Sequence, residues 1–511
     1  MLKKIIALLL CMGMMFPPAG LAGSGMTDQE IIDCSLELFS LLAAVPHPSL
    51  HEEKIAAFLM EWVGVQGISP VRDKVGNIMF EVPATAGMEN KPLCALQGHM
   101  DMVVAVADGK DFDPENDPIP VVYHEDTRTL TADGTSLGAD DGAGCVLIMA
   151  AVQGKIAHGP LRILLTVDEE DTMSGAMGMD ASWLEGVPCL INLDNEATGE
   201  VLVSSAAGDD IFASATAEFS DPEGSLALTA ALSGLQGGHS GVEINKGRLN
   251  GLIGMGLFLK ALDKAGIRWD LASFDGGTAS NAIPTGAVCT FVIHVEDREA
   301  AEQVAYTYFM ELQEQYAGIE DSMAFSLTEA ETIPQTVSET LKNNAVRYLT
   351  EIIDGVYTMS TEVEGLVESS SNLGIFRLNR DGLYARSFLR SSSGALELEI
   401  RNTQLALAAA CGFEAAWQKT SDAWPVDPGS RMTKLAGEVY SELTGKVIVE
   451  RAVHAGLECG TFAILNPALN MISIGPDLTD VHTTSETLYM NSIPKIWRLL
   501  EGILQALPKA E

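Results

Sequence analysis

Two kinds of apolar pattern follow one another along the chain. From residue 27 to about 205, stretches with helical spacing of apolar residues, such as 27–45 and 145–153, alternate with short apolar runs. These short runs have the length and composition of buried strands and cover residues 92–99, 161–167 and 188–194. The alternation predicts an α/β unit, in which active residues collect where the strands end.

Beyond that point the pattern changes to one typical of an α+β domain. A half-exposed strand followed by a helix is predicted over 224–266, and the same order returns over 286–316. We therefore expect an α+β domain at 207–421, and the repetition is compatible with two similar halves. This domain would be inserted into the α/β domain, whose two parts would cover 23–206 and 422–511.

The first residues of the chain have the layout of a secretory signal peptide. A basic start is followed by a 12-residue apolar run and by small residues, so we expect a signal peptide at 1–22 with cleavage after Ala22. The apolar run is too short to span a bilayer. The predicted location is periplasmic or extracellular, with no membrane association after cleavage. The alternatives are a lipoprotein modified at Cys11 and a cytoplasmic protein whose translation starts at Met26.

The composition excludes some classes of partner. The 511-residue chain has 70 Asp and Glu against 31 Lys and Arg, which gives a formal net charge of −39. Nucleic acids and anionic membranes bind basic patches, so neither is expected as a partner. The cysteines form no Cys-x-x-Cys pair, and Cys94, Cys189 and Cys289 lie in apolar runs, so we expect buried thiols rather than disulfides or a zinc knuckle. Free thiols fit an oxidising compartment less well.

Acidic residues and histidines stand directly after the predicted strands or in neighbouring turns. They are His99, Asp101, Asp140, Asp141, Glu169, Glu170, Asp194 and His482. Each alone has an ordinary explanation, because a single histidine is usually structural and acids at strand ends often cap helices or face water. Together they follow several strands of one α/β unit, whose ends meet at one edge of the sheet. Such a set suits two zinc-like ions that share a bridging aspartate and relieve the repulsion among the acids.

The motifs around these residues resemble those of a known family. The chain carries "GHMDMV", "SLGADDGAG", "DEE", "INLDNE", "GLQGGHSGVEI", "SNAIP", "FLRSS" and "HAGLECG", in this order, between residues 44 and 482. It resembles the bacterial aminoacyl-histidine dipeptidases (Xaa-His or beta-alanyl-histidine dipeptidases of the peptidase D type), which are co-catalytic zinc exopeptidases. The resemblance implies a catalytic domain with a mixed central sheet flanked by helices and a large inserted α+β lid domain. It also implies hydrolysis of short peptides, among them Xaa-His dipeptides and carnosine-like substrates.

The resemblance implies a ligand set for two zinc ions, with Co or Mn as substitutes. Asp140 would bridge the two ions. His99 and Glu170 would complete one site, and Asp194 and His482 the other. The implied partner is a small peptide substrate, and a homodimer is compatible with the family.

Further residues receive roles from the same resemblance. Glu169 would be the general base, and Asp101 would orient the first metal-binding histidine. His239, in the inserted domain, would stabilise the oxyanion of the tetrahedral intermediate. Asn281 and Arg390 would hold the C-terminal carboxylate or the scissile carbonyl of the substrate, and which residue holds which group stays open.

Other polar residues of these motifs are expected to play supporting roles. Asp141, Asp168 and Asp171 are expected to act as turn, support or surface acids. His454 and Glu458 are expected near the site without a ligand role. Two alternative functions stay open: a related metallohydrolase acting on tripeptides, other dipeptides or N-acyl amino acids, and a non-catalytic peptide- or metal-binding protein. An intact Glu169 argues against the second, because binding alone needs no base.

Overall fold

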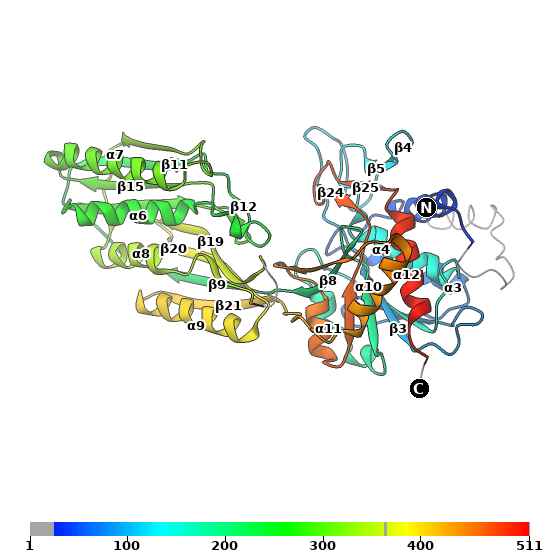
Figure 1. Cartoon of the computed structure of the whole chain (residues 1–511). Coiled ribbons are helices and arrows are strands. Elements are labelled where there is room, and N and C mark those ends of the chain that lie inside the picture. The colour runs from blue at the N-terminus through cyan, green and yellow to red at the C-terminus, as the bar shows by residue number, and fades with distance from the viewer. Residues whose placement is uncertain (1–24, 362–364, 510–511) are drawn as a thin grey trace. The chain divides into compact units, whose positions relative to one another are not determined.

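The computed structural model describes residues 25–361 and 365–509, which form two compact units (Figure 1). The described part of the first unit covers 25–204, 426–452 and 458–509. The second unit consists of Ser205–Pro425 and Val453–Leu457. The domain boundaries at 206/207 and 421/422 stay a prediction. The sequence pattern did not indicate that Val453–Leu457 would belong to the second unit. The predicted signal peptide lies outside the described residues.

The first unit is built on a mixed eight-stranded sheet. Its order is β1 (Val71–Arg72), β2 (Ile78–Val82), β6 (Leu161–Thr166), β3 (Cys94–His99), β7 (Cys189–Asn192), β23 (Asn470–Ser473), β8 (Glu200–Ser205) and β22 (Val449–Val453). Strands β6, β3, β7 and β23 run parallel, whereas β1, β2 and β8 pair antiparallel with their neighbours. The three predicted strands are β3, β6 and β7, each fully or almost fully buried. This confirms the α/β prediction.

Five helices of the first unit bury their apolar faces in one core with this sheet. They are α2 (Asp28–Ala43), α3 (Glu53–Val65), α4 (Ala139–Val152), α10 (Arg431–Thr444) and α12 (Ile493–Ala506). Two short helices of the unit, α5 (Ser174–Gly178) and α11 (Cys459–Leu465), contact each other. Helix α4 is buried on nearly all sides and packs between α2 and β3. Asp140 is the second residue of α4, and neither it nor Asp141 has the backbone angles of a regular helix.

A small second sheet joins the C-terminal segment to the residues that precede α4. Its order is β24 (Leu478–Thr479), β25 (Thr487–Tyr489), β5 (Thr129–Ala132) and β4 (Val121–His124). Strands β24 and β25 form a hairpin whose loop contains His482. Since β25 pairs with β5, this hairpin loop lies beside the turn that leads into α4 (Figure 1).

The second unit is an antiparallel nine-stranded sheet with four long helices. The sheet consists of β16 (Ala324–Glu329), β11 (Leu226–Ser233), β15 (Ala287–Ile293), β13 (Trp269–Gly276), β19 (Val367–Asn379), β20 (Gly382–Ser391), β9 (Ala207–Ala215) and β21 (Glu414–Ser421), with β18 (Gly355–Met359) beside β19. The helices are α6 (Gly251–Lys264), α7 (Arg298–Gln315), α8 (Glu339–Glu351) and α9 (Gly394–Ala410). The predicted strand–helix pairs are β11 with α6 and β15 with α7, which confirms an inserted α+β domain.

The cysteines of the described residues lie in the interior of the protein. All seven described cysteines are buried free thiols, as predicted. Within 25–361 and 365–509, no helix combines the length and apolar character needed to cross a bilayer.

Candidate metal centre

Parallel strands of the first unit deliver acids and a histidine to one edge of the sheet. Strand β3 pairs in parallel with β6 on one side and with β7 on the other. His99 is the last residue of β3, and Glu169 and Glu170 follow the end of β6. Asp194 follows the end of β7. The carboxyl ends of parallel strands meet at one edge, so these side chains converge as the sequence predicts.

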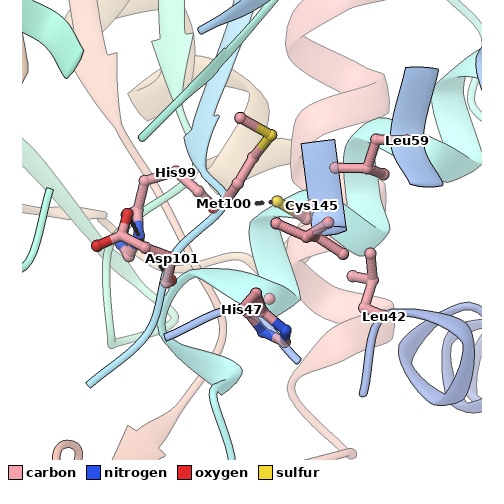
Figure 2. A pocket seen from close by; sticks show the side chains of 9 residues that line it. Leu42, His47, Leu59, His99, Met100, Asp101 and Cys145 are labelled. Carbon is pink, nitrogen blue, oxygen red and sulfur yellow. Dashed lines mark hydrogen bonds and ion pairs between the residues drawn. The ribbon is translucent and has the colours of Figure 1, made fainter. Parts of the chain in front are cut away.

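His99 is held against a small interior pocket (Figure 2). The lining is mainly apolar and consists of Leu42, His47, Ile55, Leu59, His99, Met100, Asp101, Gly142 and Cys145. All of these residues except Gly142 are buried. Burial lowers the pKa of His47, whose Nδ1 lies 2.6 Å from the carbonyl oxygen of Val45. The pocket is therefore packing space behind His99 rather than an opening for a substrate.

Asp140 and His482 reach the same place from two other elements. Asp140 lies in the first turn of α4, and His482 lies in the loop between β24 and β25. Nε2 of His482 lies 3.1 Å from Oδ2 of Asp140 and 2.9 Å from Oε2 of Glu170. Residues more than 300 positions apart in the sequence thus meet through the small sheet.

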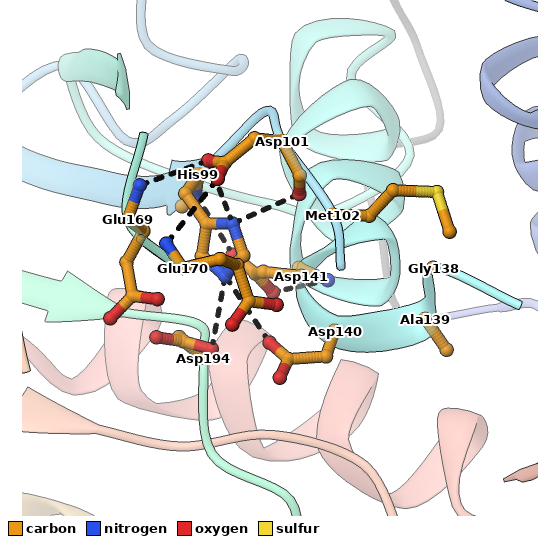
Figure 3. Close-up of polar contacts among 12 residues, drawn as sticks. His99, Asp101, Met102, Gly138, Ala139, Asp140, Asp141, Glu169, Glu170 and Asp194 are labelled. Carbon is orange, nitrogen blue, oxygen red and sulfur yellow. Dashed lines mark hydrogen bonds and ion pairs between the residues drawn. The ribbon is translucent and has the colours of Figure 1, made fainter. Parts of the chain in front are cut away.

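The contacts favour a different grouping of the ligands from the one expected above. Nε2 of His99 lies 3.2 Å from Oδ1 of Asp140 and 3.6 Å from Oδ1 of Asp194. Asp140 therefore turns one carboxylate oxygen toward each histidine, the arrangement of a bridging ligand. His99 contacts Asp140 and Asp194 (Figure 3), and His482 contacts Glu170. His99, Asp140 and Glu170, the set expected above, also lie close enough to share an ion.

The charges at the site fit divalent cations. Burial raises the pKa of Asp194 well above its usual range, and the nearby Asp140 raises it further. Burial alone would lower the pKa of His482, but its hydrogen bonds with Asp140 and Glu170 raise it to about 11. In the described part of the chain, the buried Oε1 of Glu170 has no hydrogen-bond partner. Clustered acids, a spare carboxylate oxygen and two imidazoles are a donor set that suits zinc and similar ions.

Asp141 belongs to the scaffold of the site. Its Oδ2 accepts the backbone N–H of His99 at 3.2 Å, and its Oδ1 accepts that of Gly144 at 3.0 Å. A Cβ at Gly144 would lie 2.2 Å from Oδ1, so only glycine leaves room for the carboxylate. His99, Asp141 and Asp194 lie close enough to share an ion, but both oxygens of Asp141 already accept backbone N–H groups. The contacts thus favour the supporting role that the sequence predicts.

Asp101 makes contacts on both sides of the cluster. Its Oδ1 lies 3.3 Å from Nδ1 of His99, which suits the predicted orienting role. The same carboxylate accepts the backbone N–H of Glu169 at 3.1 Å and of Glu170 at 3.3 Å. Ser49 donates its hydroxyl hydrogen to Oδ2 at 2.9 Å. Asp101 thus fixes both the histidine and the acidic segment, and sequence reasoning identified only the first of these roles.

The four consecutive acids at 168–171 have separate environments. Asp168 is buried, and its carboxylate accepts hydrogen bonds from the hydroxyls of Thr172 and Ser174. Asp171 is exposed. Glu169 and Glu170 lie between them, and Figure 3 shows both among the residues of the cluster. Burial raises the pKa of Glu169 well above its usual range, although His99 acts in the opposite direction.

Two buried glutamates support the site: Glu458, which the sequence pattern places near the site without a ligand role, and Glu486, to which it gives no role. The carboxylate of Glu486 accepts backbone N–H groups from the turn before Asp140. Oε2 of Glu458 accepts hydrogen bonds from Gln97 at 2.5 Å and Thr166 at 2.8 Å. Burial raises the pKa of Glu458 to about 7. Only the long-range fold reveals these contacts, although "HAGLECG" had drawn attention to Glu458.

The second unit brings together the other three predicted site residues. Strand β12 (Gly238–His239) pairs with β14 (Ala282–Ile283), and the N–H of Ser240 donates to the carbonyl oxygen of Asn281 at 2.8 Å. Nη2 of Arg390 lies 3.3 Å from Nε2 of His239. Burial lowers the pKa of Arg390 to about 10, and its Nε has no hydrogen-bond partner among the described residues. His454 lies in the same unit, with Nε2 2.7 Å from the hydroxyl of Ser370.

Comparison with known proteins identifies relatives along most of the chain. The sequence model of the peptidase family M20/M25/M40 matches residues 95–506. The cytosol non-specific dipeptidase of Escherichia coli (strain K12) is 32% identical over 475 residues, which cover 92% of this chain and 97% of the relative. The crystal structure of an aminoacylhistidine dipeptidase from Vibrio alginolyticus has a TM-score of 0.83 at 32% identity and covers 94% of this chain and 97% of that one. A tripeptidase from Staphylococcus aureus, with a TM-score of 0.53 at 14% identity over 95% and 99% of the two chains, shares the fold.

One prediction is wrong in the light of these relatives. The N-terminal sequence pattern predicts an exported, periplasmic or extracellular protein, whereas the Escherichia coli relative that aligns with 92% of the chain is named for the cytosol. The buried free thiols are also the state that a reducing compartment favours. The short apolar run near the N-terminus misled the prediction because its pattern resembles a signal peptide.

Proposed function

The chain belongs to the peptidase family M20/M25/M40, and we propose that it is a two-zinc dipeptidase that cleaves Xaa-His and carnosine-like dipeptides. The observation that carries the proposal is the position of Asp140 between the two histidines His99 and His482, with Asp194 and Glu170 beside them. The relatives support the substrate class, since one is named an aminoacylhistidine dipeptidase and the other a non-specific dipeptidase.

The proposed ligands divide into two groups around Asp140. His99 and Asp194 would hold one ion, His482 and Glu170 would hold the other, and Asp140 would be a ligand of both. When bound, such ions supply Lewis-acid polarisation of the scissile carbonyl and acidification of the attacking water. The pKa of His482 is raised because the carboxylates of Asp140 and Glu170 stabilise its protonated form. A bound cation would be stabilised by the same negative charges.

Glu169 is the proposed general base. It accepts a proton from the attacking water and passes it to the nitrogen of the leaving amine. Asp101 supports this role by fixing the backbone N–H of Glu169. Burial favours the protonated form of Glu169, which suits a group that holds a proton between the two transfers.

The polar cluster of the second unit is the proposed binding site for the substrate backbone. Arg390 is 6% exposed, and its unpartnered Nε can donate to the C-terminal carboxylate of a dipeptide. Asn281 contributes to the same contacts, and His239 donates to the developing oxyanion. Recognition of the free carboxylate would make the enzyme an exopeptidase.

Parallel kinetics on four substrates test the proposal. Ala-His, carnosine, a tripeptide and an N-acetyl amino acid should be offered to the zinc-loaded enzyme, and the first two should be cleaved with the highest kcat/KM. The name of the Escherichia coli relative favours a broader range of dipeptides as the second candidate, so Ala-Ala belongs in the same series. The Glu169→Ala variant should retain zinc and lose about 100-fold or more in kcat. Near-normal turnover by this variant would refute the assignment of the base.

A further inference from the structure

Glu486 and His482 share one hairpin loop. The loop joins β24 to β25, and the backbone N–H of Glu486 donates to the carbonyl oxygen of Thr483 at 3.2 Å. Strand β25 pairs with β5, and the residues after β5 form the turn that leads into α4. The small sheet therefore holds Glu486 beside the turn that precedes Asp140.

The carboxylate of Glu486 binds the backbone of this turn. Oε2 accepts the N–H groups of Leu137 at 2.7 Å and Gly138 at 3.0 Å. Oε1 accepts those of Ala139 at 2.7 Å and Asp140 at 3.4 Å. N–H groups before and within the first turn of a helix have no acceptor inside the helix, so the carboxylate of Glu486 supplies the acceptors that α4 lacks. The glutamate is 3% exposed, which keeps water from taking its place.

The opposite side of the turn is also fixed. Gly138 has φ +71°, and a Cβ there would lie 2.6 Å from Sδ of Met102, so the backbone packs directly on that side chain. The hydroxyl of Ser136 donates to the carbonyl oxygen of Val103 at 2.7 Å and accepts the N–H of Ala105 at 3.0 Å. Met102 and Ser136 thus hold one side of the turn, and the carboxylate of Glu486 holds the other. The backbone position of Asp140 therefore depends on the hydrogen bonds of Glu486.

We infer that Glu486 is a positioning residue that fixes the Asp140 carboxylate between His99 and His482 before an ion binds. The inference rests on the proposed function, because it takes Asp140 as the ligand that both ions share. Glu486 acts through the backbone of the turn and does not itself bind an ion or the substrate. A carboxylate is required, since a glutamine would turn its NH2 group toward some of the N–H donors.

The test compares Glu486→Gln with the matched control Glu501→Gln. Glu501 is 7% exposed, lies in the same unit and accepts a backbone N–H from Ala157 at 2.9 Å, but this contact is outside the metal cluster. Zinc affinity is measured by competition with a chromophoric chelator, and the geometry of the site by the absorption spectrum of the cobalt(II) form. Glu486→Gln should lose about 10- to 100-fold in zinc affinity and alter the cobalt spectrum. Glu501→Gln should lower Tm and leave both metal readouts unchanged.

Two further variants separate the possible failures. If Asp140→Asn binds zinc as tightly as the wild type, the proposed ligand set is wrong. If Asp140→Asn loses zinc while a folded Glu486→Gln binds it with wild-type affinity, the ligand set stands and the role of Glu486 is overturned. If metal-free Glu486→Gln does not fold, Glu486→Asp takes its place, because it keeps the charge on a shorter side chain. Wild-type affinity in Glu486→Asp, or unfolding of both variants, would show that Glu486 serves only the fold.

Discussion

Oδ1 of Asp101 accepts the backbone N–H of Glu169 at 3.1 Å, so the proposed base is positioned by a residue from a neighbouring strand end. Oδ1 also lies 3.3 Å from Nδ1 of His99, and the same carboxylate thereby links a proposed metal ligand to the proposed base. One side chain therefore contacts both the proposed metal-binding residue and the proposed proton acceptor.

Replacing Asp101 should therefore impair both functions. Asp101→Ala removes the carboxylate that accepts the N–H of Glu169 and contacts His99, although the backbone carbonyl oxygen of residue 101, 3.1 Å from Nδ1 of His99, remains. We expect a loss of about 10- to 100-fold in zinc affinity and in kcat. Zinc titration and steady-state kinetics at saturating zinc measure the two effects separately. Ser49→Ala is the control, because it removes one hydrogen bond to Asp101 and leaves the carboxylate in place, and it should change kcat less than 10-fold. Equal losses in the two variants would contradict the role of the carboxylate.

The two adjacent aspartates at the start of α4 should behave differently. Asp140→Asn should lose the shared ligand and with it most of the bound zinc. Asp141→Asn should retain zinc but destabilise the fold by about 1–3 kcal/mol, because one of the two backbone N–H groups that Asp141 satisfies would face an NH2 group. Elemental analysis after dialysis and thermal unfolding test both statements. Zinc retained in the first variant and lost in the second would reverse the assignment.

Glu458 should make stability depend on pH. Burial raises its pKa from 4.5 to about 7 in the folded state, so the folded protein binds the proton more tightly than the unfolded chain does. The contribution of this group is therefore present at low pH and is lost as the pH rises from 4.5 through 7. Glu458→Gln removes this titration, so its Tm relative to the wild type should increase between pH 5 and pH 8. A constant difference in Tm across this range would show that Glu458 titrates normally.

Arg390 should determine the requirement for a free carboxylate. The proposed contact predicts that the wild type cleaves a dipeptide much faster than its C-terminal amide. Arg390→Ala should raise KM for the free dipeptide by about 10-fold or more, and the preference over the amide should largely disappear. Kinetics with the two substrates on both enzymes provide the measurement. An unchanged preference in Arg390→Ala would assign carboxylate recognition to another residue.

The sequence predicted those features that depend on local pattern and on strand order. Short apolar runs identified β3, β6 and β7, and the meeting of parallel strand ends predicted that His99, Glu170 and Asp194 would approach one another. The sequence pattern also placed His482 in this cluster, and the family resemblance added its ligand role; its hairpin reaches the site through a separate sheet, which the pattern did not reveal.

The features that were missed depend on contacts between distant segments. The contact between His99 and Asp194 follows from side-chain directions at the sheet edge, which the order of motifs does not contain. Glu486 follows His482 as an ordinary polar residue in the sequence, and only the pairing of β25 with β5 places it at the turn before Asp140. A local pattern identifies a carboxylate, but it does not identify the backbone N–H group from which that carboxylate will accept a hydrogen bond.

The position of β23 has a consequence for how the protein is synthesised. This strand comes from the C-terminal segment, yet it pairs with β7 on one side and β8 on the other, and both of those precede the inserted domain. A ribosome-bound chain that ends before residue 470 thus exposes two unpaired strand edges, which are prone to aggregation. His482 emerges later still, so the proposed metal ligands can be complete only after this residue has left the ribosome.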